Sequence, residues 1–295
     1  MKEDIFQREL SWIELLSKAF QVFAANRPAI LTVLCVVFLP LSLVQSVILD
    51  RMMLGADALN TFLEAGNMAQ ADAMRLVMQT ILHEFLYFAV VLFLEPVGTI
   101  AVAKLAKQFL MKEELSAKKA MAEAIQLQPS IIVAGLIYGV LVVLGSMLVI
   151  PGIYLAIAWC LYLYAIGLCE YGGWQALCRS RALVKGRWWK TCGYYMALAG
   201  VIYLWNTVFQ LIYLFGEQTA AVNALYHFLC YFSDAFLATG MALLFINREA
   251  MAGGMQGTIS AQAKEISAQM VEETEESVEE AEKLLPETVE KEEEK

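Results

Sequence analysis

The chain has 295 residues, of which 59% are apolar and 17% are charged, and its formal net charge is -9. Because a soluble domain averages about half apolar and about a quarter charged residues, this composition excludes an ordinary soluble protein and indicates an integral membrane protein. The negative charge comes from residues 258–295, which hold 13 acidic and 4 basic side chains. The rest of the chain is neutral, and neither part has the basic character of a nucleic-acid-binding protein.

The N-terminal residues 1–10 carry mixed charge and lack the apolar region of a signal peptide, so we expect them to stay on the mature protein. Residues 11–25 place apolar side chains at helical spacing, with Ser11 and Glu14 arranged as a capping box. Residues 114–126 and 174–185 show a similar pattern. We expect three interfacial amphipathic helices, which serve either as scaffold or as binding elements for anionic lipid headgroups.

Six segments are long and apolar enough to cross a hydrocarbon layer about 30 Å thick. The uncharged run 130–169 would be about 60 Å long as one helix, so it must fold back, and Ile150-Pro151-Gly152 marks the turn. The predicted spans are 29–49, 81–103, 131–149, 153–169, 194–215 and 222–246. The sequence thus predicts an all-α polytopic membrane protein: a six-helix transmembrane domain over 1–257 and an acidic, disordered cytosolic tail over 258–295.

Basic residues predict the orientation, since Lys and Arg concentrate in cytosolic loops. Fifteen of them fall on the side that holds both termini, and only Arg51 and Arg75 fall on the other side. We therefore expect a multi-pass plasma-membrane protein with both termini in the cytosol. The one substantial external segment is 50–80, where the core 68–82 is expected to form an extra helix on the outer face.

A weak internal repeat accompanies the amphipathic helices. Lys18-Ala19-Phe20, Lys119-Ala120-Met121 and Arg181-Ala182-Leu183 share a basic-Ala-apolar triplet, and each basic residue lies ten residues before the region where a span begins. Because the three triplets occupy equivalent positions in the predicted topology, we expect three hairpin repeats, each with one amphipathic helix and two spans.

The third copy also carries a family resemblance. Its features are Ile150-Pro151-Gly152-Ile153-Tyr154, Glu170, Ala176-Leu177, Ser180, Leu183, Lys185-Gly186 and Trp188-Trp189. This block resembles the membrane-domain family that is attached to glycerophosphoryl diester phosphodiesterases and also occurs in stand-alone bacterial membrane proteins. The opening helix at 12–26 is similar too. The resemblance implies a six-span bacterial membrane protein; the phosphodiesterase activity is not implied, because an acidic tail stands where those enzymes carry a barrel domain.

The sequence gives no sign of an enzyme, a metal site or a cofactor site. It holds no nucleotide-binding, nucleophile-elbow or zinc-protease motif. The six cysteines lie in apolar runs or in predicted cytosolic segments without a CxxC pair, so we expect reduced thiols. We expect a non-enzymatic protein.

Two carboxylates inside predicted spans are the main candidates for a function, because ionisable groups in a bilayer are expensive and face the protein interior. These are Glu95, directly before Pro96, and Asp234, seven residues after His227 on one helical face. One alternative is that both are neutral or hydrogen-bonded to Asn206, Thr207 or Gln210 of the fifth span. A second is a pathway for protons, ions or small molecules, and a third is catalysis.

A second cluster surrounds the start of the fifth span, and it consists of Lys185, Arg187, Trp188, Trp189 and Lys190. Adjacent tryptophans with flanking cations are typical of anchoring at lipid headgroups. Glu170 is expected to pair with one of these cations. The sequence as a whole favours a scaffold, assembly or envelope-homeostasis factor whose partners are lipids and a membrane protein; the alternative is a transporter that uses Glu95 and Asp234.

Overall fold

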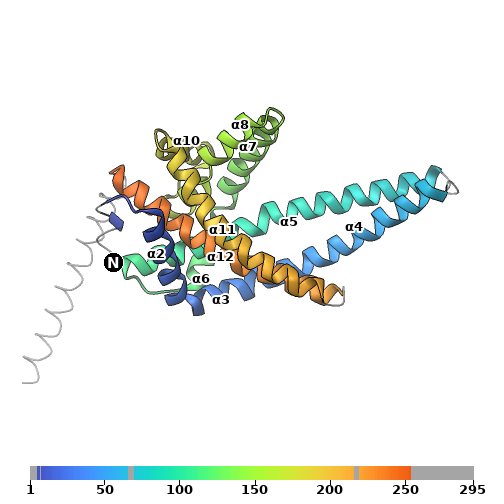
Figure 1. Ribbon diagram of the computed structural model, residues 1–295, viewed down its shortest axis with the longest axis horizontal. Coiled ribbons are helices and arrows are strands. Elements are labelled where there is room, and N and C mark those ends of the chain that lie inside the picture. The colour runs from blue at the N-terminus through green and yellow to red at the C-terminus, as the bar shows by residue number, and fades with distance from the viewer. Residues whose placement is uncertain (1–4, 7, 66–69, 216–218, 254–295) are drawn as a thin grey trace, which may run out of the picture. The chain divides into compact units, whose positions relative to one another are not determined.

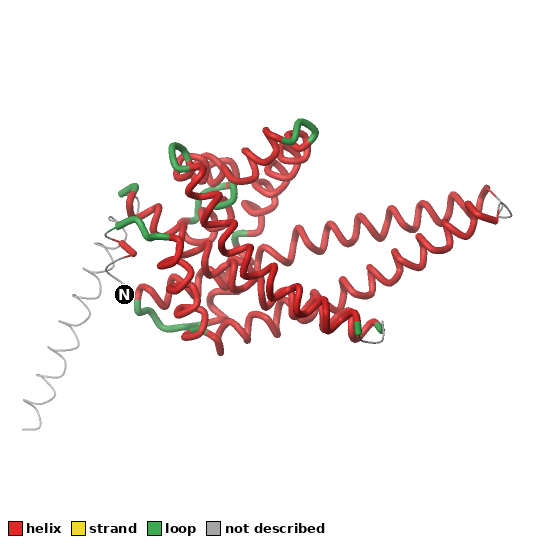
Figure 2. The backbone as a smooth tube through the Cα atoms, in the orientation of Figure 1, coloured by secondary structure: helices red, strands yellow, loops and turns green. Residues whose placement is uncertain are grey.

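The computed structural model describes residues 5–6, 8–65, 70–215 and 219–253, and every regular element in these residues is a helix (Figure 1, Figure 2). The chain divides into two units, Met1–Arg248 and Glu249–Lys295. The predicted acidic tail, 258–295, lies outside the described residues. The first unit contains all the sites considered below.

The helices follow one another with short connections. In chain order they are α2 Trp12–Ala25, α3 Arg27–Val33, the π-helix η1 Leu34–Phe38, α4 Leu39–Ala65, α5 Gln70–Met111, α6 Ala117–Gln126, α7 Gln128–Ser146, α8 Ile150–Ala158, α9 Tyr162–Cys169, α10 Gly173–Val184, α11 Trp188–Leu214 and α12 Ala220–Met251. The all-helical prediction is confirmed for the described residues, as are the three amphipathic helices, which are α2, α6 and α10.

Five segments of the described residues are long and apolar enough to cross a membrane: Arg27–Gly55, Met74–Met111, Gln128–Ser146, Ile150–Cys169 and Ala221–Met251. They coincide with five of the six predicted spans. The sixth, 194–215, lies in α11, whose 27 residues would extend about 40 Å but include several polar and aromatic side chains. The chain is therefore a membrane-embedded helical protein, while the count of six spans stays a prediction.

The predicted external segment is wrong in its detail. In place of a loop with a separate helix over 68–82, α4 continues to Ala65 and α5 begins at Gln70, and the two helices pack as one long antiparallel hairpin (Figure 1). The 42 residues of α5 extend about 63 Å, twice the thickness of the hydrocarbon layer. The described polar residues Arg51, Asp57 and Asn60 are exposed on α4, so a helix carries polar side chains that indicate a loop in the sequence.

The first predicted span contains a short π-helix, η1. In η1 the Leu39 N–H bonds to the Leu34 carbonyl, five residues back, just before Pro40, which has no N–H to donate. Phe38 at the end of η1 packs so closely on Gly98 of α5 that a Cβ there would clash with its ring. By contrast, α5 continues through Pro96 as a single helix.

The fourth predicted span is broken into α8 and α9. At the break, the buried Ser180 hydroxyl of α10 accepts a hydrogen bond from the Leu161 N–H (3.2 Å) and donates one to the Ala158 carbonyl (3.0 Å). These bonds satisfy two backbone groups that the interrupted helix leaves unpaired.

The amphipathic helices pack into the protein core. Helix α6 lies along the end of α5, α10 contacts α9, and the Phe23 ring of α2 meets Phe232 and Phe236 of α12 edge-on at 5.4 and 5.7 Å. Their buried faces therefore contact helices, while Trp12 and Phe20 of α2 and Trp174 of α10 remain exposed.

Candidate functional site

Glu95 and Asp234 lie within electrostatic range of each other. Glu95 lies on α5 and Asp234 on α12, both are half-buried, and they are close enough for their charges to interact. Tyr231 is an electrostatic neighbour of both carboxylates, and Tyr162 of α9 is a neighbour of Glu95. These polar residues of α5, α9 and α12 thus lie within electrostatic range of Glu95 in the predicted membrane region.

The expected partners on α11 do not reach these carboxylates. Thr207 donates its hydroxyl hydrogen bond to the Tyr203 carbonyl of its own helix (2.7 Å), Gln210 is exposed, and the Asn206 Oδ1 is buried without a hydrogen-bond partner. Over the described ranges, neither carboxylate forms a hydrogen bond with another side chain. The expected hydrogen bonds from α11 to Glu95 and Asp234 are therefore not formed within the described residues.

His227 is also separate from the carboxylates. Its ring packs edge-on against the Tyr226 ring, with centroids 5.7 Å apart, and it lies seven residues before Asp234 on α12, about 10 Å along the axis. A shared helical face therefore does not bring His227 to Asp234.

A buried pair that the sequence analysis missed connects α4 to α12 near the carboxylates. The Tyr231 hydroxyl donates to the Gln45 Oε1 at 2.7 Å, and both residues are buried. The Phe38 ring covers Tyr231 at a centroid distance of 4.7 Å. The only signal in the sequence is a glutamine inside an apolar span, which identifies a polar group but not its partner.

The cluster at the start of α11 divides into packing and exposed residues. The Trp188 Nε1 donates to the Tyr154 carbonyl of α8 (3.2 Å), and the two rings stack with centroids 6.1 Å apart. Trp189 is 81% exposed, and Lys185 and Arg187 are exposed. Trp189 and the cations thus fit the predicted anchoring role, whereas Trp188 holds α11 to α8.

Lys190 pairs with Glu9, and the predicted pairing with Glu170 is wrong. Its Nζ lies 3.3 Å from the Glu9 Oε2. Glu170 is exposed and adopts the left-handed backbone conformation (φ 57°) that ends α9, with its N–H bonded to the Ile166 carbonyl. This turn sends the chain into α10, and no ion pair with residues 185–190 forms within the described residues.

Glu9 also pairs with Arg248. The Arg248 Nη1 lies 2.8 Å from the Glu9 Oε1, and the Arg248 side chain is 1% exposed. The contact is an ion pair without the alignment of a hydrogen bond. Burial works to raise the pKa of Glu9, but Arg248, Lys190 and Arg187 outweigh it and hold that pKa below the ordinary value. Glu9 thus stays a carboxylate that ties the N-terminal segment to α11 and α12.

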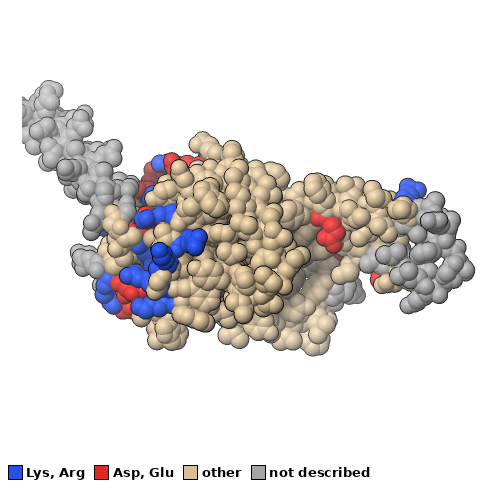
Figure 3. All heavy atoms as spheres, turned by 90° about the horizontal axis from the view of Figure 1, so that it is seen from above, with Lys and Arg blue, Asp and Glu red and all other residues tan. Residues whose placement is uncertain are grey.

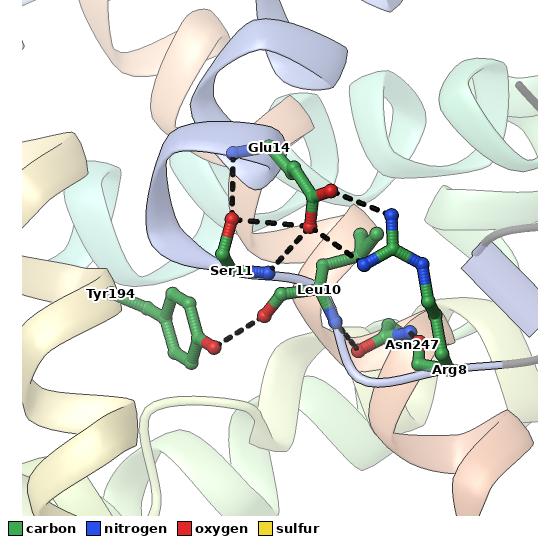
Figure 4. Close-up of polar contacts among 6 residues, drawn as sticks. All are labelled: Arg8, Leu10, Ser11, Glu14, Tyr194 and Asn247. Carbon is green, nitrogen blue, oxygen red and sulfur yellow. Dashed lines mark hydrogen bonds and ion pairs between the residues drawn. The ribbon is translucent and has the colours of Figure 1, made fainter.

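Asn247 forms a clasp on the same segment (Figure 4). Its Nδ2 donates to the carbonyls of Ile5 (2.7 Å) and Arg8 (2.8 Å), and its Oδ1 accepts from the Leu10 N–H (3.4 Å). The Tyr194 hydroxyl of α11 donates to the Leu10 carbonyl. A single buried amide thus satisfies one backbone group each of Ile5, Arg8 and Leu10.

The predicted capping box directly follows this clasp and is confirmed. Ser11 accepts from the Glu14 N–H (3.3 Å), and the Glu14 carboxylate accepts from the Ser11 N–H (2.9 Å). Arg8 pairs with Glu14 at 2.6 Å. The hydrogen bonds from Arg8 and Ser11 lower the pKa of Glu14 to about 2.

A second amide contact resembles the Asn247 clasp. The Gln108 Oε1 near the end of α5 accepts from the N–H of Ser116, the N-cap of α6 (3.2 Å), just as the Asn247 Oδ1 accepts from the residue before the N-cap of α2. Glu95 lies thirteen residues before Gln108, and Asp234 lies thirteen residues before Asn247. The carboxylate and the amide thus occur at the same spacing on α5 and α12.

The end of α5 is also fixed by its lysines. The Lys104 Nζ lies 2.6 Å from the Glu123 carboxylate of α6, and the Lys107 Nζ donates to the Leu168 carbonyl at the end of α9 (3.1 Å). No group of three or more potential metal ligands occurs in the described part of the chain.

Comparison with known proteins adds no assignment, because no family model, curated protein or solved structure matches this chain.

Proposed function

We propose that this chain is a non-enzymatic, multi-pass plasma-membrane protein that acts as a scaffold, assembly or envelope-homeostasis factor. The observation that supports this function best is the Asn247 clasp together with the neighbouring ion pair of Glu9 and Arg248. The buried polar groups at the ends of α11 and α12 fasten a chain segment, and Gln108 and Lys107 do the same at the end of α5. A platform fixed in this way suits a protein that presents surfaces to lipids and to a membrane-protein partner.

The proposed topology places both termini in the cytosol. Figure 3 shows Lys and Arg side chains gathered over one end of the described molecule, with a broad uncharged zone beside them. This distribution fits the excess of basic residues on the predicted cytosolic side. An even number of crossings places both termini on the same side of the membrane. Six crossing helices satisfy this condition, and so does an arrangement in which α7 and α8 do not cross.

The three-hairpin repeat is part of this proposal, with one change of register. Helix α2 contacts α11, α6 contacts α3, and α10 contacts α7, so each amphipathic helix packs on the first span of another copy in a closed cycle. Ala182 is exposed, whereas Ser180 is as fully buried as Ala19 and Ala120. We therefore match Ser180 to these two alanines in place of Ala182.

The burial pattern supports this register. The buried residues of α2 are Leu15, Lys18, Ala19, Val22 and Phe23, and those of α10 are Ala176, Leu177, Ser180, Leu183 and Val184. A constant offset of 161 residues relates Leu15 to Ala176, Ala19 to Ser180, Val22 to Leu183 and Phe23 to Val184. The same offset relates the first residues of α3 and α11.

The proposed relation to the membrane-domain family rests on residues 150–189 and on the opening helix. In the structure these residues form α8, α9, α10, their connections and the first two residues of α11, and they include the Ser180 bridge and the Trp188 contact. They hold neighbouring segments together, so the relation implies a shared membrane scaffold and no phosphodiesterase activity.

Site-specific photocrosslinking tests the scaffold function. The exposed Met74 and Met78 on the outer part of α5 and Trp189 at the start of α11 are replaced one at a time by a photoreactive amino acid in cells. We expect a discrete protein adduct at one of these positions and none at the buried control position Ala101. Lipid adducts alone at every exposed position would contradict the partner that this function requires.

The second candidate is a transporter, which is favoured by the proximity of Glu95 and Asp234. Glu95→Gln and Asp234→Asn keep the shape of each side chain and remove its charge. A scaffold predicts that the double variant complements a deletion strain and that the wild type in proteoliposomes carries no proton flux. A coupling site predicts a measurable flux that both variants abolish at normal membrane abundance.

A further inference from the structure

The hairpin of α7 and α8 lies against residues that belong to one side of the membrane. Trp188 holds the Tyr154 carbonyl of α8 and stacks on the Tyr154 ring. Two residues further along, Lys190 pairs with Glu9, which also pairs with the buried Arg248. Ion pairs of this kind belong at or outside the headgroup layer, because charges are costly in the hydrocarbon layer.

The tip of this hairpin is only a short distance from that layer. The turn ends at Ile150, four residues before Tyr154, which is about 6 Å along a helix. The hydrocarbon layer is about 30 Å thick. A straight fourth span would require Tyr154 and Trp188 to lie near opposite faces, yet they are in contact.

Helix α7 also runs across α5 and not along it. The Gln128 Nε2 donates to the Phe93 carbonyl of α5, and Gly135 of α7 packs on the neighbouring Leu92. Seven residues of α7, about 10 Å, thus correspond to a single residue of α5, about 1.5 Å. Figure 1 shows the two helices in clearly different directions. If α5 crosses the bilayer, α7 is strongly tilted toward its plane.

The tip is suited to hydrocarbon. Met147, Leu148, Val149 and Ile150 are 78%, 72%, 63% and 78% exposed, in a stretch without any charged residue from 130 to 169. The N–H groups of Leu148, Val149 and Ile150 bond to the carbonyls of Gly145, Ser146 and Leu148. Because the turn satisfies these donors internally, it can enter lipid without unpaired N–H groups.

The backbone conformation of Val149 is a second indication that the tip of the hairpin is suited to hydrocarbon. It has φ 55° and ψ -65°, a strained conformation in which a β-branched residue is unfavourable and glycine is tolerated. The bond from the Ile150 N–H to the Leu148 carbonyl closes the tight turn around it. An apolar side chain therefore stands at the apex although glycine would relieve the strain.

We propose that α7 and α8 form a re-entrant hairpin, which enters the leaflet on the side of Lys190, returns to the same side, and contacts the acyl chains of that leaflet through Met147–Ile150. This inference rests on the membrane embedding in the proposed function. It replaces the predicted third and fourth spans by a hairpin that does not cross, so α4, α5, α11 and α12 would be the crossing helices.

Cysteine labelling of the full-length chain tests the hairpin. In a variant without the six native cysteines, Leu148→Cys reports on the tip, Asn60→Cys on the outer end of α4, and Lys118→Cys on α6. A membrane-impermeant maleimide is applied to intact cells and to inverted vesicles. We expect Leu148→Cys to be at least about tenfold less reactive from either side than the accessible control, and to react once detergent dissolves the membrane.

Two results would overturn the hairpin. Labelling of Leu148→Cys from the side that labels Asn60→Cys would show a full crossing, and labelling from the side of Lys118→Cys would place the tip in water. If instead Asn60→Cys and Lys118→Cys label from one side, the proposed topology fails whatever the tip does.

Depth measurement provides a second, independent readout. Met147→Cys is labelled with a fluorophore in detergent and reconstituted into phosphatidylcholine vesicles that carry a spin-labelled acyl chain. We expect at least twofold stronger quenching than for the same label at Lys118→Cys, and equal quenching at the two positions would contradict insertion. The control is that Met147→Cys can be extracted from the membrane and elutes from size-exclusion chromatography at the volume of the wild type, which shows that the substitution leaves the fold intact.

Discussion

Replacing Asn247 by leucine should release the N-terminal segment. The substitution preserves the volume of the side chain but removes its three hydrogen bonds to Ile5, Arg8 and Leu10. At about 1 kcal/mol for each net hydrogen bond, the docked state loses about 3 kcal/mol. Since 1.36 kcal/mol corresponds to a factor of ten, the undocked population should rise by about 100-fold.

Hydrogen exchange of the Leu10 amide measures this change directly, because its N–H is one of the three groups that Asn247 binds. We expect its exchange in lipid nanodiscs to accelerate by about 100-fold, with little change for amides in the middle of α5. Asn223→Leu is the matched control: Asn223 also lies on α12, but it binds Asp50 and Tyr213 at the other end of the helix. Unchanged exchange at Leu10 in Asn247→Leu, or equal acceleration in the control, would refute the clasp.

Three further predictions follow from the described contacts and the tail. The pKa values of Glu9 and Glu14 are lowered in the folded chain, so the stabilisation from these carboxylates is present above the ordinary value of 4.5 and is lost as pH falls through the folded values. After correction for intrinsic exchange rates, exchange of the Leu10 amide should therefore stay constant from pH 7 to 5 and rise toward pH 2. The rise should be smaller in Glu9→Gln. Ser180→Ala removes both hydrogen bonds at the break between α8 and α9 and leaves the Leu161 N–H buried and unpaired. The free energy of unfolding, measured by thermal unfolding in detergent, should therefore fall by about 1 to 3 kcal/mol. Ser17→Ala on the outer face of α2 is the control and should be nearly neutral. Deleting residues 258–295 should leave membrane insertion and thermal stability unchanged, since that segment is charged and has little to bury; loss of folded protein on truncation would contradict this.

Local features of this chain are readable from its sequence, and pairings between distant segments are not. The capping box of Ser11 and Glu14 depends on a spacing of three residues, and the apolar spans depend on composition over about 20 residues. The Tyr231–Gln45 bond joins residues 186 positions apart, and the Asn247 contacts join still more distant ones. No periodic signal relates such residues, so the sequence indicates buried polar groups without their partners.

Charge and polarity mislead in two places. The polar side chains of 50–80 indicate a loop, but α4 continues to Ala65 and α5 begins at Gln70, and the described Arg51, Asp57 and Asn60 are exposed on α4. Glu170 and Lys190 are both near predicted membrane boundaries, which favours an ion pair, but the left-handed turn at Glu170 and the proximity of Glu9 to Lys190 decide otherwise. Backbone conformation determines which charges meet, and composition does not encode it.

The contact between α2 and α12 has a consequence for biosynthesis. Phe23 meets Phe232 and Phe236, which the ribosome adds about 200 residues later, or about 10 to 40 seconds at 5–20 residues per second. During that interval Phe23 lacks its ring contacts on α12, and the N-terminal segment lacks its hydrogen bonds to Asn247. Helix α2 can therefore reach its native position only after almost the whole protein has been inserted, and a chain truncated before α12 would display the apolar face of α2 to the quality-control machinery of the membrane.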